Sequence, residues 1–532
     1  MKKRLLSLLL LVVPMLTFAQ EKGLDQKIDE AFKPVSDFFS NVIFFEVFGT
    51  PFVLVLLVAS AAFFTLYFKF PNFRHFFTAI NVVRGKYDDL EHATVNPELA
   101  IDGDIKDTIK DESEEGEVSH FQALATAVSG TVGNGNIAGV ALAIALGGPG
   151  ATFWMIVCGL LGMSTKFVEC TLGVQYRDVG EDGTVYGGPM YYISKGLKER
   201  GFEILGKIAA VLFAIFCIGG SFGGGNAAQS NQATVVLKEL MGLESTAAGF
   251  WIGVVLAIAV GVIIIGGIKR IASVTEKVVP FMAVLYILAC LYILGANFSL
   301  VDDAISLIVT EAFNPTAIGV GGIIGVLLVG FKRAAFSNEA GAGSASIAHS
   351  AVKTKYSASE GLVALLEPFI DTVVICTMTA LVIIIFNFGG HFEYGADVSA
   401  DGSGAVMIAG EVVQGAGITS KAFAQYIPYS NIFLTVAVVL FAVSTMISWS
   451  YYGLQSWKFL FGRGKKADLA YKVLFLIFVV IGAAASMGSI WSFSDAMIFA
   501  MVFPNMIGLY FLFPVVKKQL RRYMDAIKTS KA

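Results

Sequence analysis

Long runs of apolar residues alternate with short polar segments along most of this chain. Most runs have about the 20 residues that a helix needs to cross a bilayer. They predict membrane-spanning helices at residues 51–70, 121–146, 151–174, 208–235, 250–268, 278–294, 320–348, 361–386, 432–457, 471–489 and 496–516. The pattern therefore predicts an all-α integral membrane protein with about eleven transmembrane helices.

The run at residues 121–146 has a polar, glycine-rich centre that reads Ser129-Gly130-Thr131-Val132-Gly133-Asn134-Gly135-Asn136. Glycine and asparagine are poor helix formers, and irregular backbone at membrane depth is tolerated only where it is buried in protein or lines a cavity. The pattern predicts a broken helix whose free N–H and carbonyl groups can hold an anionic group and a small cation. A glycine-rich face for helix packing is the alternative.

A second interruption lies in the run at residues 320–348. This run is apolar as far as Phe331 and then reads Lys332-Arg333-Ala334-Ala335-Phe336-Ser337-Asn338-Glu339 before small residues resume. We expect these charges to face a cavity or to form pairs, for example Glu339 with Lys332 or Arg333. A helix that ends at Phe331 is the alternative, but its apolar part is short for a bilayer.

The two interruptions occupy corresponding positions, because they are the first and sixth of the ten runs that follow residues 51–70. Five helices per half place the halves in opposite orientations, which is the inverted-repeat plan of many secondary transporters. The sequence thus predicts one N-terminal helix at residues 51–70 and a 5+5 inverted repeat, with the first repeat at 121–294 and the second at 320–516.

Polar segments flank these helices. Residues 1–19 have the basic, apolar and small-residue parts of a signal peptide, with an uncleaved anchor as the alternative. We expect residues 20–50 to be extracytoplasmic, 71–120 to form an acidic cytoplasmic linker, 389–426 to form an external cap or a long loop, and 517–532 to form a basic cytoplasmic tail.

The distribution of Lys and Arg predicts the orientation. These residues are concentrated in the loops that this topology places inside. The expected protein is a multi-pass protein of the bacterial cytoplasmic (inner) membrane, with its N-terminus outside and its C-terminus in the cytoplasm.

Composition narrows the function classes. Hydrophobic residues make up 56% of the chain and charged residues 15%. This composition indicates a protein embedded in a lipid bilayer. The net charge of -3 argues against a nucleic-acid partner. Five cysteines without paired spacing predict neither disulfides nor a zinc site. The five histidines are scattered and form no His-Glu-x-x-His motif, so an enzyme is not expected.

Four motifs carry a resemblance to a known family: residues 116–124 (GEVSHFQAL), 130–140 (GTVGNGNIAGV), 147–151 (GGPGA) and 336–344 (FSNEAGAGS). Together they resemble the alanine or glycine:cation symporter family over about residues 51–516. The sequence departs from it at Arg333-Ala334-Ala335-Phe336, where the family usually has Arg-Gly before the aromatic residue.

The resemblance implies the leucine-transporter-type fold and sodium-coupled import of small neutral amino acids, alanine or glycine foremost, by alternating access. A monomer is expected. Coupling to protons, or a broader range of neutral amino acids, is the alternative. A channel is less favoured, because the sequence shows no repeated filter loop or ring of pore charges.

Sodium prefers oxygen ligands, so hydroxyls and broken-helix carbonyls suit it. The resemblance to the symporter family implies where sodium binds. We expect it to be held by the side chains of Ser444 and Thr445 and by the carbonyls of Ser129 and Val132. Hydroxyls that bond back to the preceding helical turn are the alternative.

We expect the amino acid to lie against the first break, where N–H groups around Thr131, Asn134 and Gly135 suit a carboxylate. Gln229 is expected to contact the substrate, by similarity to the family. Trp449 lies one turn beyond Thr445 and could limit the pocket to small side chains; an interfacial or lipid-facing tryptophan is the alternative. Phe336 and Asn338 of the second break complete the expected pocket.

Other charges lie within predicted helices. Lys166 and Glu169 are three residues apart, and Glu367 and Asp371 are one turn apart, so we expect each pair to interact. Structural pairing or gating is favoured over proton relay, because no histidine accompanies them in the sequence.

Overall fold

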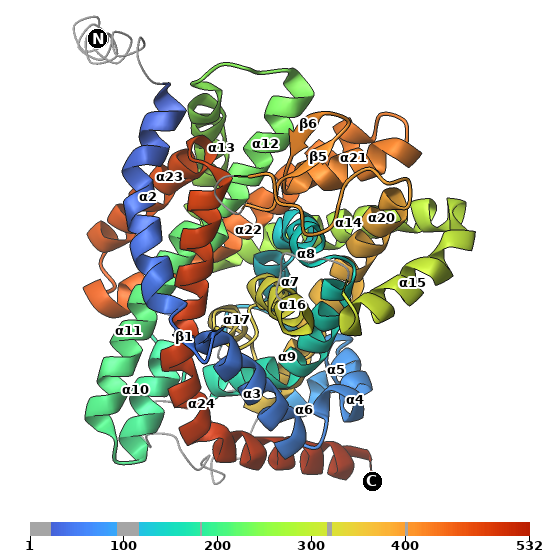
Figure 1. Ribbon diagram of the computed structural model, residues 1–532. Coiled ribbons are helices and arrows are strands. Elements are labelled where there is room, and N and C mark those ends of the chain that lie inside the picture. Colours follow the sequence, from blue (N-terminus) through green and yellow to red (C-terminus); the bar gives the residue numbers. More distant parts are fainter. Residues whose placement is uncertain (1–22, 93–115, 181–182, 316–321, 400–402, 532) are drawn as a thin grey trace, which may run out of the picture.

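The computed structural model describes residues 23–92, 116–180, 183–315, 322–399 and 403–531. These residues form a bundle of helices (Figure 1) with three two-stranded antiparallel sheets at its edges. The sheets pair β1 (Glu46–Val47) with β2 (Thr50–Pro51), β3 (Asp178–Val179) with β4 (Val185–Tyr186), and β5 (Val406–Ile408) with β6 (Glu411–Val413). The predicted signal peptide at residues 1–19 and the most acidic part of the linker lie outside the described residues.

Helices that precede the two repeats occupy the edge of the bundle. They are α2 (Leu24–Ile43), α3 (Phe52–Tyr67), α4 (Pro71–Arg74), α5 (Phe76–Val83) and α6 (Asp88–His92). The described part of the predicted linker is therefore largely helical.

The first half begins with the broken helix. Its elements are α7 (His120–Thr131), η1 (Gly135–Gly139), α8 (Val140–Gly147), α9 (Gly150–Gln175), α10 (Pro189–Glu199), α11 (Glu203–Phe222), η2 (Gly223–Ala227), α12 (Ala228–Met241), α13 (Ala248–Ile264) and α14 (Gly267–Ala296). The segments η1 and η2 are short π-helical turns, which occur frequently at functional sites. A further helix, α15 (Phe298–Phe313), leads to the second half.

The second half begins with the other interruption. Its elements are α16 (Gly322–Asn338), α17 (Ala345–His349), α18 (Ser357–Ala364), α19 (Leu366–Pro368), η4 (Phe369–Cys376), α20 (Thr377–Asn387), α21 (Ala416–Tyr426), α22 (Ser430–Phe461), α23 (Lys465–Ala484) and α24 (Met487–Lys531). A short helix follows the second spanning element of each half. It is α10 in the first half and α21 in the second, as expected if the two halves share one order of elements.

The predicted fold class is confirmed: the chain is an all-α membrane protein with two broken helices. Within the described ranges, seven helical segments are long and apolar enough to cross a membrane, and α7 with α8 makes an eighth that is bent by 51°. The apolar helices α3 and α13 are shorter. Each of the eleven predicted runs contains a helix, and the number that crosses the membrane stays a prediction.

The second break begins later than the charges suggested. Helix α16 continues through Lys332 and Arg333 to Asn338, so a helix that ends at Phe331 is wrong. The chain then turns at Glu339, which has φ of 56°, and at Gly341 and Gly343, with φ of 96° and 86°. Left-handed backbone cannot continue a right-handed helix, and the two glycines adopt it without steric cost.

Helix α2 lies alongside α24 (Figure 1). The hydroxyl of Ser36 donates to the Ser489 carbonyl over 2.7 Å. The Asp25 carboxylate accepts from the backbone N–H groups of Gly249 and Phe250, each over 3.2 Å, and so caps the N-terminus of α13. The predicted extracytoplasmic segment is thus docked on helices of both halves.

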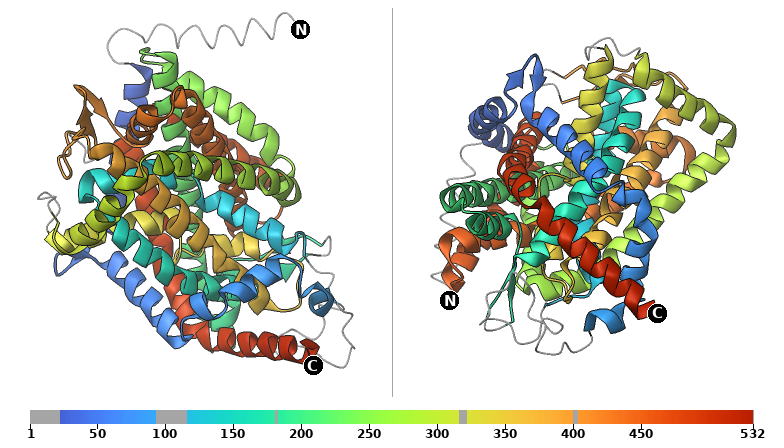
Figure 2. Two further views of the ribbon diagram at one scale, coloured as in Figure 1. Left: turned by 90° about the vertical axis from the view of Figure 1, so that its right-hand side faces the viewer. Right: turned by 90° about the horizontal axis from the view of Figure 1, so that it is seen from below.

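Two other flanking segments are also packed against the bundle. In the segment at residues 389–426, the Thr419 hydroxyl donates to the Ile137 carbonyl of η1 over 3.2 Å, and the Ala416 N–H donates to Gln232 Oε1 over 3.0 Å. The predicted basic tail continues α24 and lies across one end of the molecule (Figures 1 and 2). There the hydroxyl of Tyr523 donates to Glu91 Oε1 over 2.6 Å.

Candidate functional site

The first break, residues 132–134, is stabilised by amide side chains. The Gly133 N–H donates to Asn136 Oδ1 over 2.8 Å, and the Asn134 N–H donates to Gln229 Oε1 over 3.0 Å. The Asn134 amide in turn donates to the Gln229 carbonyl over 3.2 Å. The structure therefore brings Gln229 and Asn134 together, and the Asn134 N–H is already bonded to Gln229. A carboxylate that binds here has to replace the Gln229 oxygen.

Thr445 is also brought to the break. Its hydroxyl donates to the Ser129 carbonyl over 2.9 Å, while the Ser129 hydroxyl donates to the Ser444 carbonyl over 2.9 Å. The Ser444 hydroxyl donates to the Phe441 carbonyl of its own helix over 3.0 Å. For Ser444 this is the alternative to sodium binding, a hydroxyl that bonds back to the preceding turn. The Thr131 hydroxyl likewise bonds back, to the Ala127 carbonyl at 3.3 Å.

Gly133 lies between Thr445 and Gln229. A Cβ atom at Gly133 would lie 2.5 Å from Thr445 Oγ1 and 3.0 Å from Gln229 Oε1. Only glycine leaves these two side chains next to the broken backbone. The sequence marked Gly133 as part of the break but gave no sign of this close approach.

Trp449 connects the two breaks. Its indole N–H lies 3.2 Å from the Gly130 carbonyl and 2.9 Å from Glu339 Oε1. The side chain is only 1% exposed, so an interfacial or lipid-facing tryptophan is wrong. Gly225 of η2 makes room for it, because a Cβ atom there would lie 2.0 Å from Trp449 Cγ.

The expected residues of the second break face other partners. The ring of Phe336 stacks on Trp491 with centroids 5.0 Å apart. The Asn338 amide donates to Thr372 Oγ1 over 2.9 Å. Ser337 is the residue that meets the first break, since a Cβ atom at Gly135 would lie 3.4 Å from its Cα.

Asp371 connects the breaks from η4. Its carboxylate accepts from the Asn136 amide over 2.6 Å, from the Ser337 hydroxyl over 2.9 Å and from the Thr372 hydroxyl over 2.7 Å. The expected pairing with Glu367 is wrong, and Asp371 instead holds side chains of both broken helices. Only the tertiary fold brings these residues together.

The other expected charge pairs do not form either. Their members pair with residues on different helices. Lys166 lies 3.0 Å from Glu367, while Glu169 accepts from Asn505 over 2.7 Å. Lys332 and Arg333 both pair with Asp495 rather than with Glu339. The Ser344 hydroxyl and the Trp449 indole N–H donate to Glu339.

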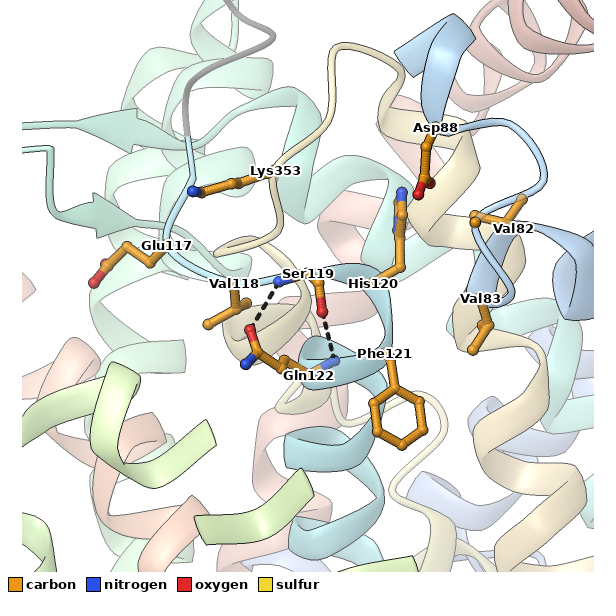
Figure 3. A pocket seen from close by; sticks show the side chains of 11 residues that line it. Val82, Val83, Asp88, Glu117, Val118, Ser119, His120, Phe121, Gln122 and Lys353 are labelled. Atoms are coloured by element: carbon orange, nitrogen blue, oxygen red, sulfur yellow. Dashed lines mark hydrogen bonds between the residues drawn. The ribbon is translucent and has the colours of Figure 1, made fainter. Parts of the chain in front are cut away.

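Two cavities lie at opposite ends of the broken helix. One of about 280 Å³ lies where α7 begins and is lined by Ser119, His120 and Gln122 (Figure 3). The other, of about 210 Å³, lies near the end of α8 and is lined by Trp491 and Asp495 among others. The site between them is enclosed, as the side chains of Asn134, Gln229, Thr445 and Trp449 are at most 4% exposed.

This arrangement suits reversible binding rather than bond chemistry. The break offers backbone dipoles, amides and a hydroxyl, and oxygen atoms of Ser129 and Thr445 meet where a hard cation could bind. All five cysteines are buried and free, which agrees with a role as small core residues. In the described part of the chain, no group of three His, Cys, Asp or Glu side chains is arranged to hold a metal ion.

Similar solved structures include MhsT and a manganese transporter. The crystal structure of MhsT in complex with L-phenylalanine aligns with a TM-score of 0.46 and 15% identity, over 76% of this chain and 99% of that chain. A manganese transporter of Eremococcus coleocola aligns with a TM-score of 0.47 and 15% identity, over 74% of this chain and 78% of that chain.

Sequence comparisons are more specific. The Sodium/alanine symporter AgcS of Methanococcus maripaludis is 38% identical over 479 residues, which cover 90% of this chain and 95% of that protein. A Sodium/proton-dependent alanine carrier protein of Bacillus sp. is 32% identical over 423 residues, which cover 79% of this chain and 91% of the relative. The family model of the sodium:alanine symporters matches residues 35–532. The chain therefore belongs to the sodium:alanine symporter family, a family of secondary transporters and not of enzymes.

Proposed function

We propose that this protein imports small neutral amino acids, alanine and glycine foremost, together with sodium. The observation that carries the proposal is the junction at the first break, where Gln229 holds Asn134 and the Thr445 hydroxyl meets the Ser129 carbonyl. Amides and backbone N–H groups for a zwitterion thus lie beside oxygen ligands for a cation. The names of AgcS and of the Bacillus carrier point to the same substrate.

The substrate carboxylate binds at the N–H groups of Asn134 and Gly135, with Gln229 turning from Asn134 to the substrate. Asn134 Oδ1 is buried and has no hydrogen-bond partner among the described residues, so it is available to accept from the substrate ammonium group. We expect Trp449 and the close packing around Gly133 to restrict the bound side chain to about the size of a methyl group. Phe336, Asn338 and Thr131 act at the edge of this pocket.

Sodium binds between the carbonyls of Ser129 and Val132 and the hydroxyls of Thr445 and Ser444. Thr445 needs only to turn from the Ser129 carbonyl, whereas Ser444 has to leave its bond to Phe441. Because sodium and the amino acid bind on the same broken helix, each stabilises the backbone conformation that the other requires.

The two cavities support a mechanism of alternating access. The Phe336–Trp491 stack and the pairing of Arg333 with Asp495 separate the site from the cavity at the end of α8, and the first turns of α7 separate it from the other cavity. We place the cavity at the end of α8 outside the cell. The N-terminus then lies outside and the C-terminus in the cytoplasm, in the topology that the sequence predicts, with a monomer as the transporting unit.

The test is uptake of radiolabelled alanine into proteoliposomes that hold the purified protein. An inward sodium gradient should drive saturable uptake that glycine inhibits and leucine does not, and replacing sodium by choline should abolish it. Uptake that follows a pH gradient in the complete absence of sodium would support the proton-coupled alternative. Efficient competition by leucine would support the broader substrate range, and non-saturable flux would indicate a channel.

A further inference from the structure

The cavity near the end of α8, called the outer cavity below, has an excess of positive charge in its wall. Its charged residues are Lys332, Arg333 and Asp495. Lys332 Nζ lies 3.0 Å from Asp495 Oδ2, and the Arg333 guanidinium donates to the same oxygen atom. Two cations therefore share one carboxylate. Because uncompensated charge in a buried place is costly, this wall favours the approach of an anionic group.

Three polar atoms in the same wall have no partner. They are Arg333 Nη1, Trp491 Nε1 and Asp495 Oδ1, and none of them is hydrogen-bonded within the part of the chain that the structure describes. The three residues are at most 5% exposed. Buried polar atoms are rarely left unpaired, so three of them around one cavity point to a ligand that bonds to them.

Aromatic rings hold the two cations in place. The Arg333 guanidinium lies 5.6 Å from the centroid of the Phe336 ring and 5.5 Å from that of the Trp491 ring. Lys332 Nζ lies 4.5 Å from the centroid of the ring of Phe44, which directly follows α2. These contacts restrict the positions that the cations can adopt, and such restriction lowers the entropic cost of binding a ligand.

The unpartnered atoms match the two charged ends of an amino acid. Arg333 Nη1 and Trp491 Nε1 are donors and suit a carboxylate, whereas Asp495 Oδ1 is an acceptor and suits an ammonium group. The volume of about 210 Å³ is below the range of about 300–1,000 Å³ for drug-sized ligands, as expected for a molecule the size of an amino acid. The lining also includes the apolar side chains of Leu142, Leu146, Val329 and Met487.

The three atoms belong to the barrier between the outer cavity and the first break. In the proposed mechanism this barrier is the Arg333–Asp495 pair together with the Phe336–Trp491 stack. The atoms have almost no exposed surface in this closed arrangement. Movement of the barrier, which alternating access requires, uncovers them. An amino acid that enters through the outer cavity therefore meets these atoms before it reaches the break.

We propose that Arg333, Trp491 and Asp495 form a second amino-acid site in the outer cavity, separate from the site at the first break. The arginine and the indole donate to the substrate carboxylate, and the aspartate accepts from the ammonium group. This inference rests on the proposed function, because it takes the same small neutral amino acid as the ligand. The second site includes none of the proposed sodium ligands, so binding there does not require sodium.

The first experiment counts the alanine molecules that the unmodified protein binds. It uses equilibrium dialysis of the purified protein in detergent against radiolabelled alanine over a wide range of concentrations. In sodium we expect two molecules per chain, with unequal affinities. With choline in place of sodium, the molecule at the first break should be lost and one molecule per chain should remain.

The outcomes of this count separate the two proposals. One molecule per chain in sodium and none in choline would overturn the inference and leave the proposed function intact. The unpartnered atoms would then be satisfied by water alone. The absence of specific alanine binding in both salts would overturn the proposed function together with the inference.

The second experiment locates the site. Trp491→Phe removes the indole N–H but keeps a ring that can stack on Phe336, so the affinity for alanine in choline should fall about two- to tenfold, as expected for one lost hydrogen bond. Trp457→Phe is the matched control, because the Trp457 indole N–H is also unpartnered among the described residues and Trp457 does not line the outer cavity. Equal affinities of the two variants would overturn the assignment of Trp491.

A third variant tests the cavity from its apolar side. Leu146→Trp fills part of the volume and leaves the charged residues unchanged. It should abolish alanine binding in choline and leave one molecule per chain in sodium. Two molecules per chain in this variant would overturn the inference, and this result decides the matter even if Trp491→Phe fails to fold.

Discussion

The Thr445 hydroxyl donates to the Ser129 carbonyl over 2.9 Å, across from one helix to the broken end of another. Its neighbour Ser444 instead donates within its own helix, to the Phe441 carbonyl. Two adjacent hydroxyls that look equivalent in the sequence therefore differ in what they offer a cation at the break.

This difference predicts unequal effects on sodium. Thr445→Ala should raise the sodium concentration for half-maximal alanine uptake by about tenfold or more, because a contact to a charged group is worth about 1.5–3 kcal/mol. Ser444→Ala serves as the neighbouring control and should have a clearly smaller effect. If Thr445→Ala keeps the sodium dependence of the unmodified protein in proteoliposomes, Thr445 is not part of the ion site.

Replacement of Gln229 should weaken substrate binding. Gln229→Ala removes a polar contact worth about 0.5–1.5 kcal/mol, so the apparent alanine constant should rise about two- to tenfold. Gln232→Ala is the control, because Gln232 lies on the same helix and bonds to Asn231 and to the Ala416 N–H. Uptake kinetics that change equally in both variants would point to a general effect on α12.

The indole of Trp449 should set the size limit. Trp449→Ala opens volume beside the break, so leucine should begin to compete with alanine for uptake. The size limit exists because overpacking costs about 1–3 kcal/mol. Competition assays with a series of neutral amino acids check this result. Continued exclusion of leucine by a variant that still transports alanine would assign the limit to another residue.

Gly225 should tolerate no side chain. Gly225→Ala places a Cβ atom 2.0 Å from Trp449 Cγ, so we expect loss of alanine transport or a lower melting temperature. Gly295→Ala is the control, since the added Cβ would meet nothing within 4 Å beyond its chain neighbours and the backbone of its own helix. Thermal unfolding in detergent and uptake in liposomes measure the two effects, and a functional, stable Gly225→Ala protein would show that Trp449 can move.

Asp495 should be important for stability. It is 3% exposed and pairs with both Lys332 and Arg333. Asp495→Asn leaves two cations without their partner, and breaking a buried pair costs about 3–5 kcal/mol, so the melting temperature should fall clearly. Asp468→Asn removes a more exposed partner of Lys458 and Lys472 and should change it little. Similar melting curves for the two variants would contradict this ranking.

The sequence predicted what depends on local pattern. Apolar length located the helices, and the glycines and asparagines around Gly133 and Asn134 located the first break. The charged residues at 332–339 indicated a second break. The helix nevertheless extends to Asn338 before left-handed backbone begins. The position of this ending depends on φ angles at Glu339 and Gly341, which charge and hydropathy do not encode.

Partners on other helices could not be predicted in the same way. Spacing along one helix suggested Lys166 with Glu169 and Glu339 with Arg333, but the fold supplied Glu367 and Asp495 instead. His349 and Glu360 are eleven residues apart and were not recognised as neighbours. Buried charges choose partners by three-dimensional proximity and desolvation, and sequence separation carries little information about either.

The docking of α2 has a consequence for biosynthesis. Ser36 and its acceptor Ser489 are 453 residues apart, so the ribosome synthesises nearly the entire chain before this contact can form. Until α23 and α24 emerge, α2 lacks its final binding surface, although Asp25 can already bond to the start of α13. Non-local contacts of this kind form late in folding. Nascent chains truncated before residue 487 should therefore expose α2 to added protease, and full-length chains should protect it.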